Sequence, residues 1–239
     1  MELHRLVAGV HQFQNNVFAN QRKFFERLAK TQSPPGLFIT CADSRVNPNL
    51  ITQTQPGELF ILRNIGNIVP PFTPHTADGA AAAAIEYAVT NLNVEFVIVC
   101  GHSHCGAVQG LLNMDGLAHM PSVRGWLANA ESARRIVQEN YKDLGEDEKL
   151  NVAIQENVLC QLEHLRTHPS VAVRMSRGDL QIYGWVYKLE TGEVFGFSPE
   201  AGQFVSLRER APESTTTTVG HGVDLKSRWR RCENGRGIT

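Results

Sequence analysis

Three side chains of types that commonly bind metal ions follow two short apolar runs of this sequence. The run 97–100 (Val-Ile-Val-Cys) is followed by His102 and Cys105, and the run 37–40 (Leu-Phe-Ile-Thr) is followed directly by Cys41. Short apolar runs rich in β-branched residues are typical of buried strands. If the two runs form neighbouring parallel strands, their carboxyl ends lie at one edge of a sheet, where open α/β sheets bind ligands.

Two thiolates and one imidazole are ligands that Zn²⁺ binds, and three protein ligands leave the fourth tetrahedral position open. The set of Cys41, His102 and Cys105 therefore favours a catalytic zinc ion, one per chain. A second interpretation makes Cys41 the nucleophile of a cysteine-based phosphatase or sulfur transferase and Arg45 its anion-binding group, although fewer residues separate the two than in the usual phosphatase signature. A third interpretation is a zinc-stabilised scaffold or assembly protein with little activity, which needs a fourth protein ligand such as Cys100, His104 or Asp43.

The segments around these residues resemble the β-class carbonic anhydrases. The segment 41–45 (Cys-Ala-Asp-Ser-Arg) comes about sixty residues before 101–106 (Gly-His-Ser-His-Cys-Gly), and this pair of motifs is specific to that family. The resemblance covers roughly residues 1–200. It is strongest with the cyanobacterial, carboxysomal branch, judging by the His-Ser-His-Cys-Gly-Ala stretch and by the segment 184–192.

This resemblance implies the zinc-dependent, reversible hydration of carbon dioxide to bicarbonate and a proton, with the zinc ion held by Cys41, His102 and Cys105. It assigns Asp43 to orienting the attacking oxygen, and Arg45 to keeping Asp43 ionised and aimed. For the carboxysomal branch it further implies the supply of carbon dioxide from bicarbonate for carbon fixation.

The resemblance also implies a narrow apolar pocket for carbon dioxide, with five pocket residues: Gln32, Val46, Phe60, Tyr87 and Gly106. Gln32 is expected to reach the active site of a neighbouring subunit and to hydrogen-bond the substrate. Without the resemblance, Gln32 is equally a solvated loop residue and Tyr87 a plain core residue. No residue is assigned as the proton shuttle, for which Tyr87 and His104 are the two candidates.

Two further positions bear on regulation. Members of the family that are regulated by bicarbonate have a Trp three residues before the first zinc cysteine and a Gly one residue before it, and their Asp can swing onto the metal. Here these positions hold Phe38 and Thr40. We therefore expect the open form at neutral pH, with Asp43 away from the metal.

Length and composition fit an ordinary globular α/β domain. The chain has 239 residues, of which 42% are apolar and 20% charged, and its formal net charge is −1. This balance gives no indication of binding to nucleic acid or to an anionic membrane. The first residues do not read as a signal peptide, and no apolar run reaches transmembrane length. The odd number of cysteines, five, favours a reducing compartment, so a cytoplasmic location is expected. The resemblance to the carboxysomal branch further implies a place within the carboxysome.

The pattern of apolar residues predicts an α/β fold with a mostly parallel central sheet flanked by helices. Strands are expected at 37–40, 59–62, 97–100, 180–187 and 194–197. Helices are expected at 1–30, after the Asn47-Pro48 pair, and at 78–92, 107–112 and 152–166, with a polar helical region at 113–150 that includes a charged turn near residue 146. On the last helix, Cys160 is expected in the core, and His164 and the nearby His168 on the surface.

The two ends of the chain are interpreted separately from the catalytic domain, which we place at residues 1–205. Residues 1–30 form an N-terminal helical arm, whose apolar stripe packs either on its own core or, as the resemblance implies, across a dimer partner. The dimer is the expected basic unit, alone or within a higher oligomer such as a hexamer built as a trimer of dimers. Residues 206–239 are expected to form a flexible tail, which either docks on a carboxysome scaffold protein or is a solvated end.

Overall fold

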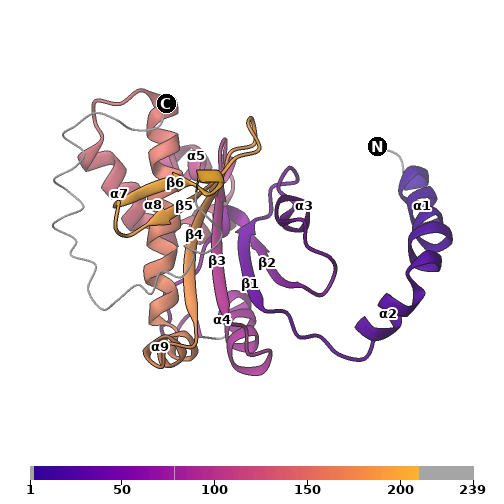
Figure 1. Ribbon diagram of the computed structural model, residues 1–239. Helices are drawn as coiled ribbons and strands as arrows, with labels where there is room; N and C mark the ends of the chain where they lie inside the picture. The colour runs from indigo at the N-terminus through magenta and orange to yellow at the C-terminus, as the bar shows by residue number, and fades with distance from the viewer. Residues whose placement is uncertain (1–2, 78, 210–239) are drawn as a thin grey trace.

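A six-stranded sheet organises the computed structural model, which describes residues 3–77 and 79–209 (Figure 1). The strand order is β2-β1-β3-β4-β5-β6. The bounds are β1 Gly36–Cys41, β2 Leu59–Asn64, β3 Phe96–His102, β4 Gln181–Tyr187, β5 Val194–Ser198 and β6 Gln203–Ser206. The first three of the five strand pairings along this order are parallel and the last two antiparallel, so the prediction of a mostly parallel sheet is confirmed.

The central strands are those whose sequence is a continuous apolar run. Every residue of β1 is buried, as is every residue of β3 after Phe96, because each strand has a parallel neighbour on both sides and side chains packed on both faces. Strand β4 instead alternates, with Ile182, Gly184 and Val186 buried against the helical layer. The ends of β1 and β3 that carry the candidate ligands are thereby fixed deep in the sheet.

One face of the sheet is covered by helices, chiefly α8, which packs against β3 and β4 (Figure 1). The close approach of α8 requires Gly184, because a Cβ atom there would lie 2.9 Å from Cγ1 of Val158. The helices of the body are α3 Pro48–Thr52, α4 Ala80–Glu86, α5 Gly106–Leu112, α6 Pro121–Leu127, α7 Glu131–Asn140, α8 Glu146–Thr167 and α9 Pro169–Ser176. A π-helical turn, Tyr87–Asn91, continues α4.

The opposite face of the sheet carries a smaller apolar cluster. Phe38, Ile98 and Cys100 are buried there, and partly buried aromatic side chains that include Tyr183 and Trp185 surround them. The rings of Phe38 and Trp185 meet edge to face, with their centroids 6.0 Å apart.

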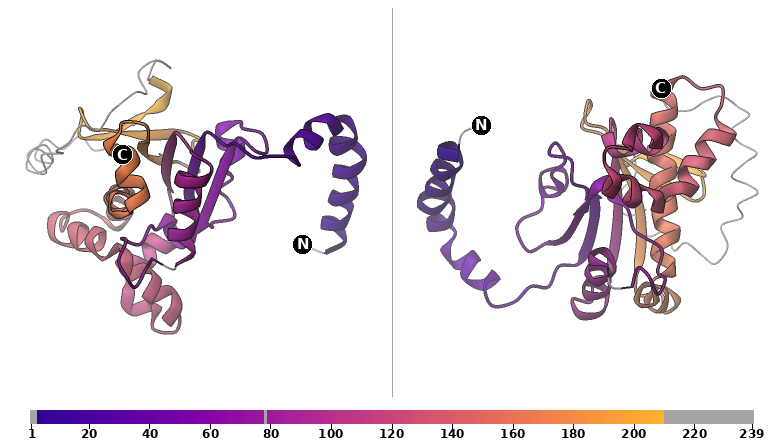
Figure 2. Two further views of the ribbon diagram at one scale, coloured as in Figure 1. Left: turned by 90° about the horizontal axis from the view of Figure 1, so that it is seen from below. Right: turned by 180° about the vertical axis from the view of Figure 1, so that it is seen from behind.

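The N-terminal arm stands away from the sheet, as Figures 1 and 2 show. It consists of α1 Leu3–Gln12, a π-helical turn Phe13–Phe18 and α2 Arg22–Leu28, and none of these elements contains a buried residue. Its apolar stripe faces solvent in the single chain, with Leu3 71% and Leu6 52% exposed. The arm therefore does not pack on its own core, and the first of the two interpretations of this segment is wrong.

Helix α8 begins six residues earlier than the sequence predicted. Glu146 and its acidic neighbours form its first turn, where the carboxylate of Glu148 accepts a hydrogen bond from the N–H of Gly145 at 3.0 Å. The expected charged turn near residue 146 is thus the start of the helix.

The expectation for two histidines was also wrong. His168 is 3% exposed, and its Nε2 lies 3.0 Å from the carbonyl oxygen of Pro70. His164 is partly buried, with Nδ1 2.7 Å from the carbonyl oxygen of Val69. Cys160, on the same helix as His164, is partly buried, and its Sγ lies 2.9 Å from the hydroxyl oxygen of Ser132.

Near the C-terminus the structure adds an edge strand, β6, that the sequence did not predict. It pairs with β5 and is followed by a 3₁₀ turn, Leu207–Glu209, so the folded chain runs at least to residue 209, past the predicted boundary at 205. The rest of the predicted tail, 210–239, lies outside the described residues. Among the residues that are described, no helix is long and apolar enough to cross a membrane.

Candidate active site

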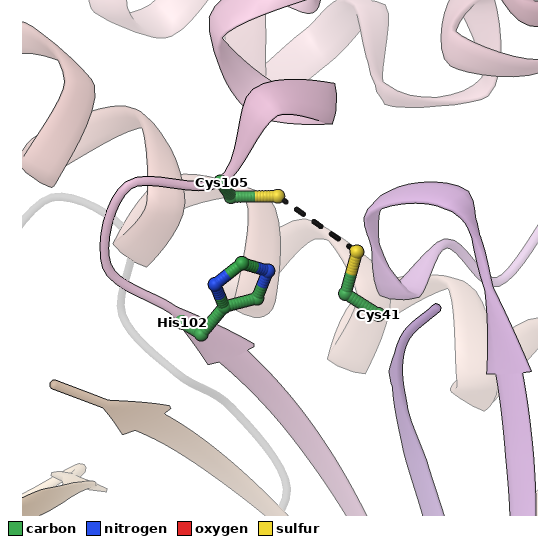
Figure 3. A group of neighbouring side chains, drawn as sticks. All are labelled: Cys41, His102 and Cys105. Carbon is green, nitrogen blue, oxygen red and sulfur yellow. Dashed lines mark hydrogen bonds between the residues drawn. The ribbon is translucent and has the colours of Figure 1, made fainter. Parts of the chain in front are cut away.

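The three predicted metal ligands meet at the carboxyl edge of the parallel strands. The register pairs Thr40 with Cys100, so Cys41 ends its strand level with Gly101, and His102 follows one residue further on the neighbouring strand. Cys105 returns to this point as the residue before α5. All three residues are buried, and their ligand atoms lie within 4.8 Å of one another. In Figure 3 the two sulfur atoms, 4.0 Å apart, point toward each other beside the imidazole of His102.

The tautomer of His102 suits a metal ligand. Its Nδ1 lies 2.9 Å from the carbonyl oxygen of Ser103, and because a carbonyl can only accept, Nδ1 carries the proton. Nε2 is then an unprotonated lone pair, buried and without a hydrogen-bond partner in the described part of the chain. A buried, unpartnered nitrogen is costly unless something binds it.

The thiol of Cys105 shares its proton with Cys41 in a hydrogen bond whose sulfur atoms are 4.0 Å apart. The hydrogen bond from Cys105, with a smaller contribution from the N–H of Gly66 at 3.4 Å, lowers the pKa of Cys41 to about 4. The same bond, together with burial, raises the pKa of Cys105. A cation that replaced the shared proton would bind both sulfur atoms. Two thiolates and one imidazole are ligands of the softness that zinc prefers, so these residues fit Zn²⁺.

A carboxylate–guanidinium pair lies beside this cluster. Nε of Arg45 donates to Oδ1 of Asp43 at 2.9 Å and its second terminal nitrogen donates to Oδ2 at 2.8 Å, a two-point contact. The backbone N–H of Arg45 also donates to Oδ1. These bonds hold the pKa of Asp43 well below its usual range. Oδ2 of Asp43 is 3.9 Å from Nε2 of His102, which brings the carboxylate to the rim of the cluster.

Arg63 was not singled out from the sequence, although it belongs to this site. From the end of β2 its guanidinium donates to the carbonyl oxygens of Cys41, at 3.2 Å, and Asp43, at 2.6 Å. Arg63 thus fixes the backbone between Cys41, a predicted metal ligand, and the Asp43–Arg45 pair (the dyad). The only signal in the sequence was an arginine at the end of an apolar run, next to Asn64, which is too common to interpret.

The predicted pocket residues divide into two groups. Val46 is buried directly after the dyad, with its N–H bonded to the carbonyl oxygen of Asp43, and Gly106 is the exposed first residue of α5. The remaining three, Gln32, Phe60 and Tyr87, are not brought to the metal cluster of their own chain. Phe60 pairs with Leu37, four residues before Cys41, which is roughly 13 Å along a strand.

Phe60 and Tyr87 instead form an aromatic pair of their own. Their ring centroids are 6.0 Å apart, and Tyr87 remains 45% exposed. Gln32 is exposed on the segment between the arm and β1, at the opposite end of β1 from Cys41. All three therefore lie toward the amino ends of the strands, on a surface that is open in the single chain.

A largely parallel sheet with a Cys–His–Cys set and a carboxylate–guanidinium pair at its carboxyl edge defines an α/β protein with a candidate metal centre. The family model described as carbonic anhydrase matches residues 36–194. A carbonic anhydrase of Synechococcus elongatus is 48% identical, over 87% of this chain and 76% of its own length. One from Pseudomonas aeruginosa is 42% identical, over 85% and 91%.

Solved structures agree with these relatives. The β-carbonic anhydrase CcaA superimposes with a TM-score of 0.84 and 44% identity, covering 87% of this chain and 93% of that one. A tetrameric β-carbonic anhydrase of Sordaria macrospora gives a TM-score of 0.71 and 29% identity, covering 82% and 96%. The chain therefore belongs to the β-class carbonic anhydrases, of the cyanobacterial type, and is an enzyme.

Proposed function

We propose that this chain catalyses the reversible hydration of carbon dioxide at a zinc ion held by Cys41, His102 and Cys105. The observation that carries the proposal is the position of the Asp43–Arg45 pair next to three buried, converging ligand atoms. A bound Zn²⁺ ion would acidify a water molecule in the open fourth position. The chain's own residues then have to orient that oxygen, admit carbon dioxide and exclude competing ligands.

Asp43 orients the attacking oxygen. Because its carboxylate is ionised at neutral pH, Asp43 can only accept a hydrogen bond. An O–H group beside Oδ2 therefore donates its hydrogen to Asp43 and turns its lone pair toward the carbon atom of the substrate. Arg45 is itself anchored on the other side by the carbonyl oxygen of His104 at 3.2 Å, which limits how far the pair can turn.

The same contacts support the open form at neutral pH. Both oxygens of Asp43 are engaged by Arg45, so the carboxylate would have to give up this two-point contact to bind the metal as a fourth ligand. Phe38 is buried against Trp185, and the hydroxyl of Thr40 donates to the carbonyl oxygen of Cys100 at 2.9 Å. Both side chains thus have structural roles at the positions where regulated relatives are expected to have Trp and Gly.

The substrate pocket is completed by a second copy of the chain, so the working unit is a homodimer or an oligomer built from dimers. Two features support this: the exposed apolar stripe of the arm, and the placement of Gln32, Phe60 and Tyr87 away from the metal cluster of their own chain. The β-carbonic anhydrase of Sordaria macrospora, which shares the fold, is a tetramer.

The test of the dimer is a charge placed on the arm. Leu6→Asp combined with Val10→Asp should shift sedimentation toward the monomer and abolish most of the activity, because both side chains belong to the exposed stripe. The control is Arg5→Asp, on the opposite side of α1 at helical spacing. A double variant that sediments like wild type and remains active would rule out this role of the arm.

In the cell, the enzyme supplies carbon dioxide from bicarbonate within the carboxysome, and its C-terminal tail docks on a scaffold protein there. The similarity to cyanobacterial carbonic anhydrases supports this proposal. A fluorescent fusion lacking residues 210–239 tests it and leaves every residue of the described fold in place. Unchanged localisation of the shortened protein would exclude targeting by the tail.

The activity itself is tested by stopped-flow hydration of carbon dioxide on protein whose zinc content has been measured, with Asp43→Ala alongside. We expect about one zinc ion per chain, rapid hydration by wild type and a large loss in the variant at unchanged zinc content. A fully zinc-loaded wild type without activity would favour the alternative of a zinc-stabilised scaffold.

A further inference from the structure

The loop that joins β3 to α5 is fixed at its centre by Ser103, which is buried. The N–H of Ser103 donates to the carbonyl oxygen of Tyr187 at 2.9 Å. Its hydroxyl accepts a hydrogen bond from the N–H of Leu189 at 2.8 Å and donates one to Oε2 of Glu190 at 2.6 Å. The loop is therefore tied to the connection between β4 and β5 by three hydrogen bonds at a single residue.

Glu190 decides the direction of this network. The hydrogen bond from Ser103 lowers the pKa of Glu190, so its carboxylate is ionised at neutral pH and can only accept. The hydroxyl hydrogen of Ser103 must therefore point to the Glu190 carboxylate. A lone pair of the Ser103 hydroxyl oxygen then remains to accept from the N–H of Leu189. Oε2 of Glu190 also lies 3.6 Å from Nε2 of His104, the next residue of the loop.

The same two residues support both halves of the active site. The carbonyl oxygen of Ser103 accepts from Nδ1 of His102 at 2.9 Å and so sets the tautomer and direction of that ring. The carbonyl oxygen of His104 accepts from Arg45 at 3.2 Å. His104 has a φ of 54°, which is uncommon for a residue other than glycine and needs support from its surroundings. A shift of this loop would move the imidazole ligand and the dyad together.

We propose that Glu190, acting through Ser103, is a positioning residue for the metal site: it fixes the loop that presents His102 and Cys105, and so sets metal affinity and ligand geometry. The inference rests on the proposed zinc site but concerns residues outside the ligand set. Removing an outer partner of metal ligands commonly weakens metal binding or activity by about 10–100-fold. Glu190 contacts the loop and no ligand directly, so we expect about tenfold, the lower end of that range.

The experiment compares zinc affinity, by competition with a chromophoric chelator, and the visible spectrum of the Co²⁺-substituted protein in five variants. They are Glu190→Ala, Glu190→Gln, Ser103→Ala, the double alanine variant and Thr191→Ala. The last is the matched control, because the hydroxyl of Thr191 accepts from the N–H of Glu193 at 3.3 Å within the same connection. It loosens the connection without removing a bond to the metal loop.

We expect Glu190→Ala to lose about tenfold in zinc affinity and to shift the Co²⁺ bands, and Thr191→Ala to match wild type in both. The double variant should be no weaker than Ser103→Ala, because in this proposal Glu190 acts through its bond to the Ser103 hydroxyl. Glu190→Gln retains an acceptor and should stay nearer to wild type than to Glu190→Ala.

Three results would overturn the inference: zinc affinity and Co²⁺ spectrum of Glu190→Ala equal to those of Thr191→Ala, fully additive losses in the double variant, or equal losses in Glu190→Gln and Glu190→Ala. These results leave the proposed function intact if wild type binds zinc and hydrates carbon dioxide. A wild type that does not bind zinc overturns both.

Discussion

We expect Arg45 to act by aiming Asp43 rather than by keeping it charged, and Arg45→Met separates the two effects. In the structure the guanidinium contacts both carboxylate oxygens and lowers the pKa of Asp43. Without it, the pKa of Asp43 returns toward the ordinary value of about 3.9. At pH 7 a carboxyl group with that pKa is still ionised by about 1000 to 1. Protonation of Asp43 therefore cannot account for a loss of activity near neutrality.

The expected result is a parallel fall of the whole pH profile. We predict that kcat/KM of Arg45→Met is lower by about 10–100-fold between about pH 6 and pH 9, with zinc content unchanged, because the carboxylate stays charged but loses its direction. Arg45→Lys keeps the positive charge but loses the two-point fork, so it should recover only part of the rate. The assay is stopped-flow hydration of carbon dioxide across this pH range, with zinc measured in each sample.

Two results would refute this reasoning. A variant that regains the wild-type rate at high pH would show that the arginine acts on the protonation of Asp43. Full activity in Arg45→Lys would show that charge alone suffices and that the paired contacts at 2.9 and 2.8 Å do not matter.

Two further predictions concern stability. Gly184→Ala should lower the free energy of unfolding by about 1–3 kcal/mol in urea titrations, because its Cβ would lie 2.9 Å from Val158, whereas Gly125→Ala in open space should not destabilise the protein. Glu131→Gln should cost about 1 kcal/mol or less near neutral pH, since Glu131 is partly exposed. Its bonds to Arg134 and Arg135 lower the pKa of Glu131 to about 2. This stabilisation is therefore present above the unfolded pKa of 4.5 and disappears as the pH falls toward 2. A difference in the free energy of unfolding between variant and wild type that persists near pH 2 would contradict the prediction.

The sequence predicted the metal cluster because its geometry follows from neighbouring parallel strands. Buried runs such as 37–40 and 97–100 are recognisable from composition, and residues just past their carboxyl ends meet at one edge whatever the rest of the chain does. The contacts that support the cluster were not predictable in this way. Ser103 and Glu190 are 87 residues apart, and nothing in either local pattern indicates that they meet.

Other errors of prediction have the same physical origin. His168 reads as a surface residue just past an amphipathic helix, yet its ring is buried and lies 3.0 Å from a carbonyl oxygen 98 residues earlier in the chain. Strand β6 has only four residues at the edge of the sheet, too few for a recognisable alternation. The apolar residues of the arm recur at helical spacing, and this spacing predicts a packed face whether the partner is the same chain or a second copy.

The rival interpretations are weakened by specific contacts. A phosphatase needs Arg45 free to bind an anion, but Asp43 occupies its guanidinium. A structural zinc site needs a fourth protein ligand, and Cys100 lies on the opposite face of the sheet, where burial raises its pKa to about 12. Membership of the carbonic anhydrase family agrees with both points.

The most direct measurement is a crystal structure at neutral pH with anomalous diffraction at the zinc edge. We predict one zinc ion per chain within bonding distance of Cys41, His102 and Cys105, with a non-protein oxygen as its fourth ligand and Asp43 still paired with Arg45. A zinc ion with Asp43 or any other side chain as its fourth ligand, or an ion bound elsewhere, would contradict the proposed active site.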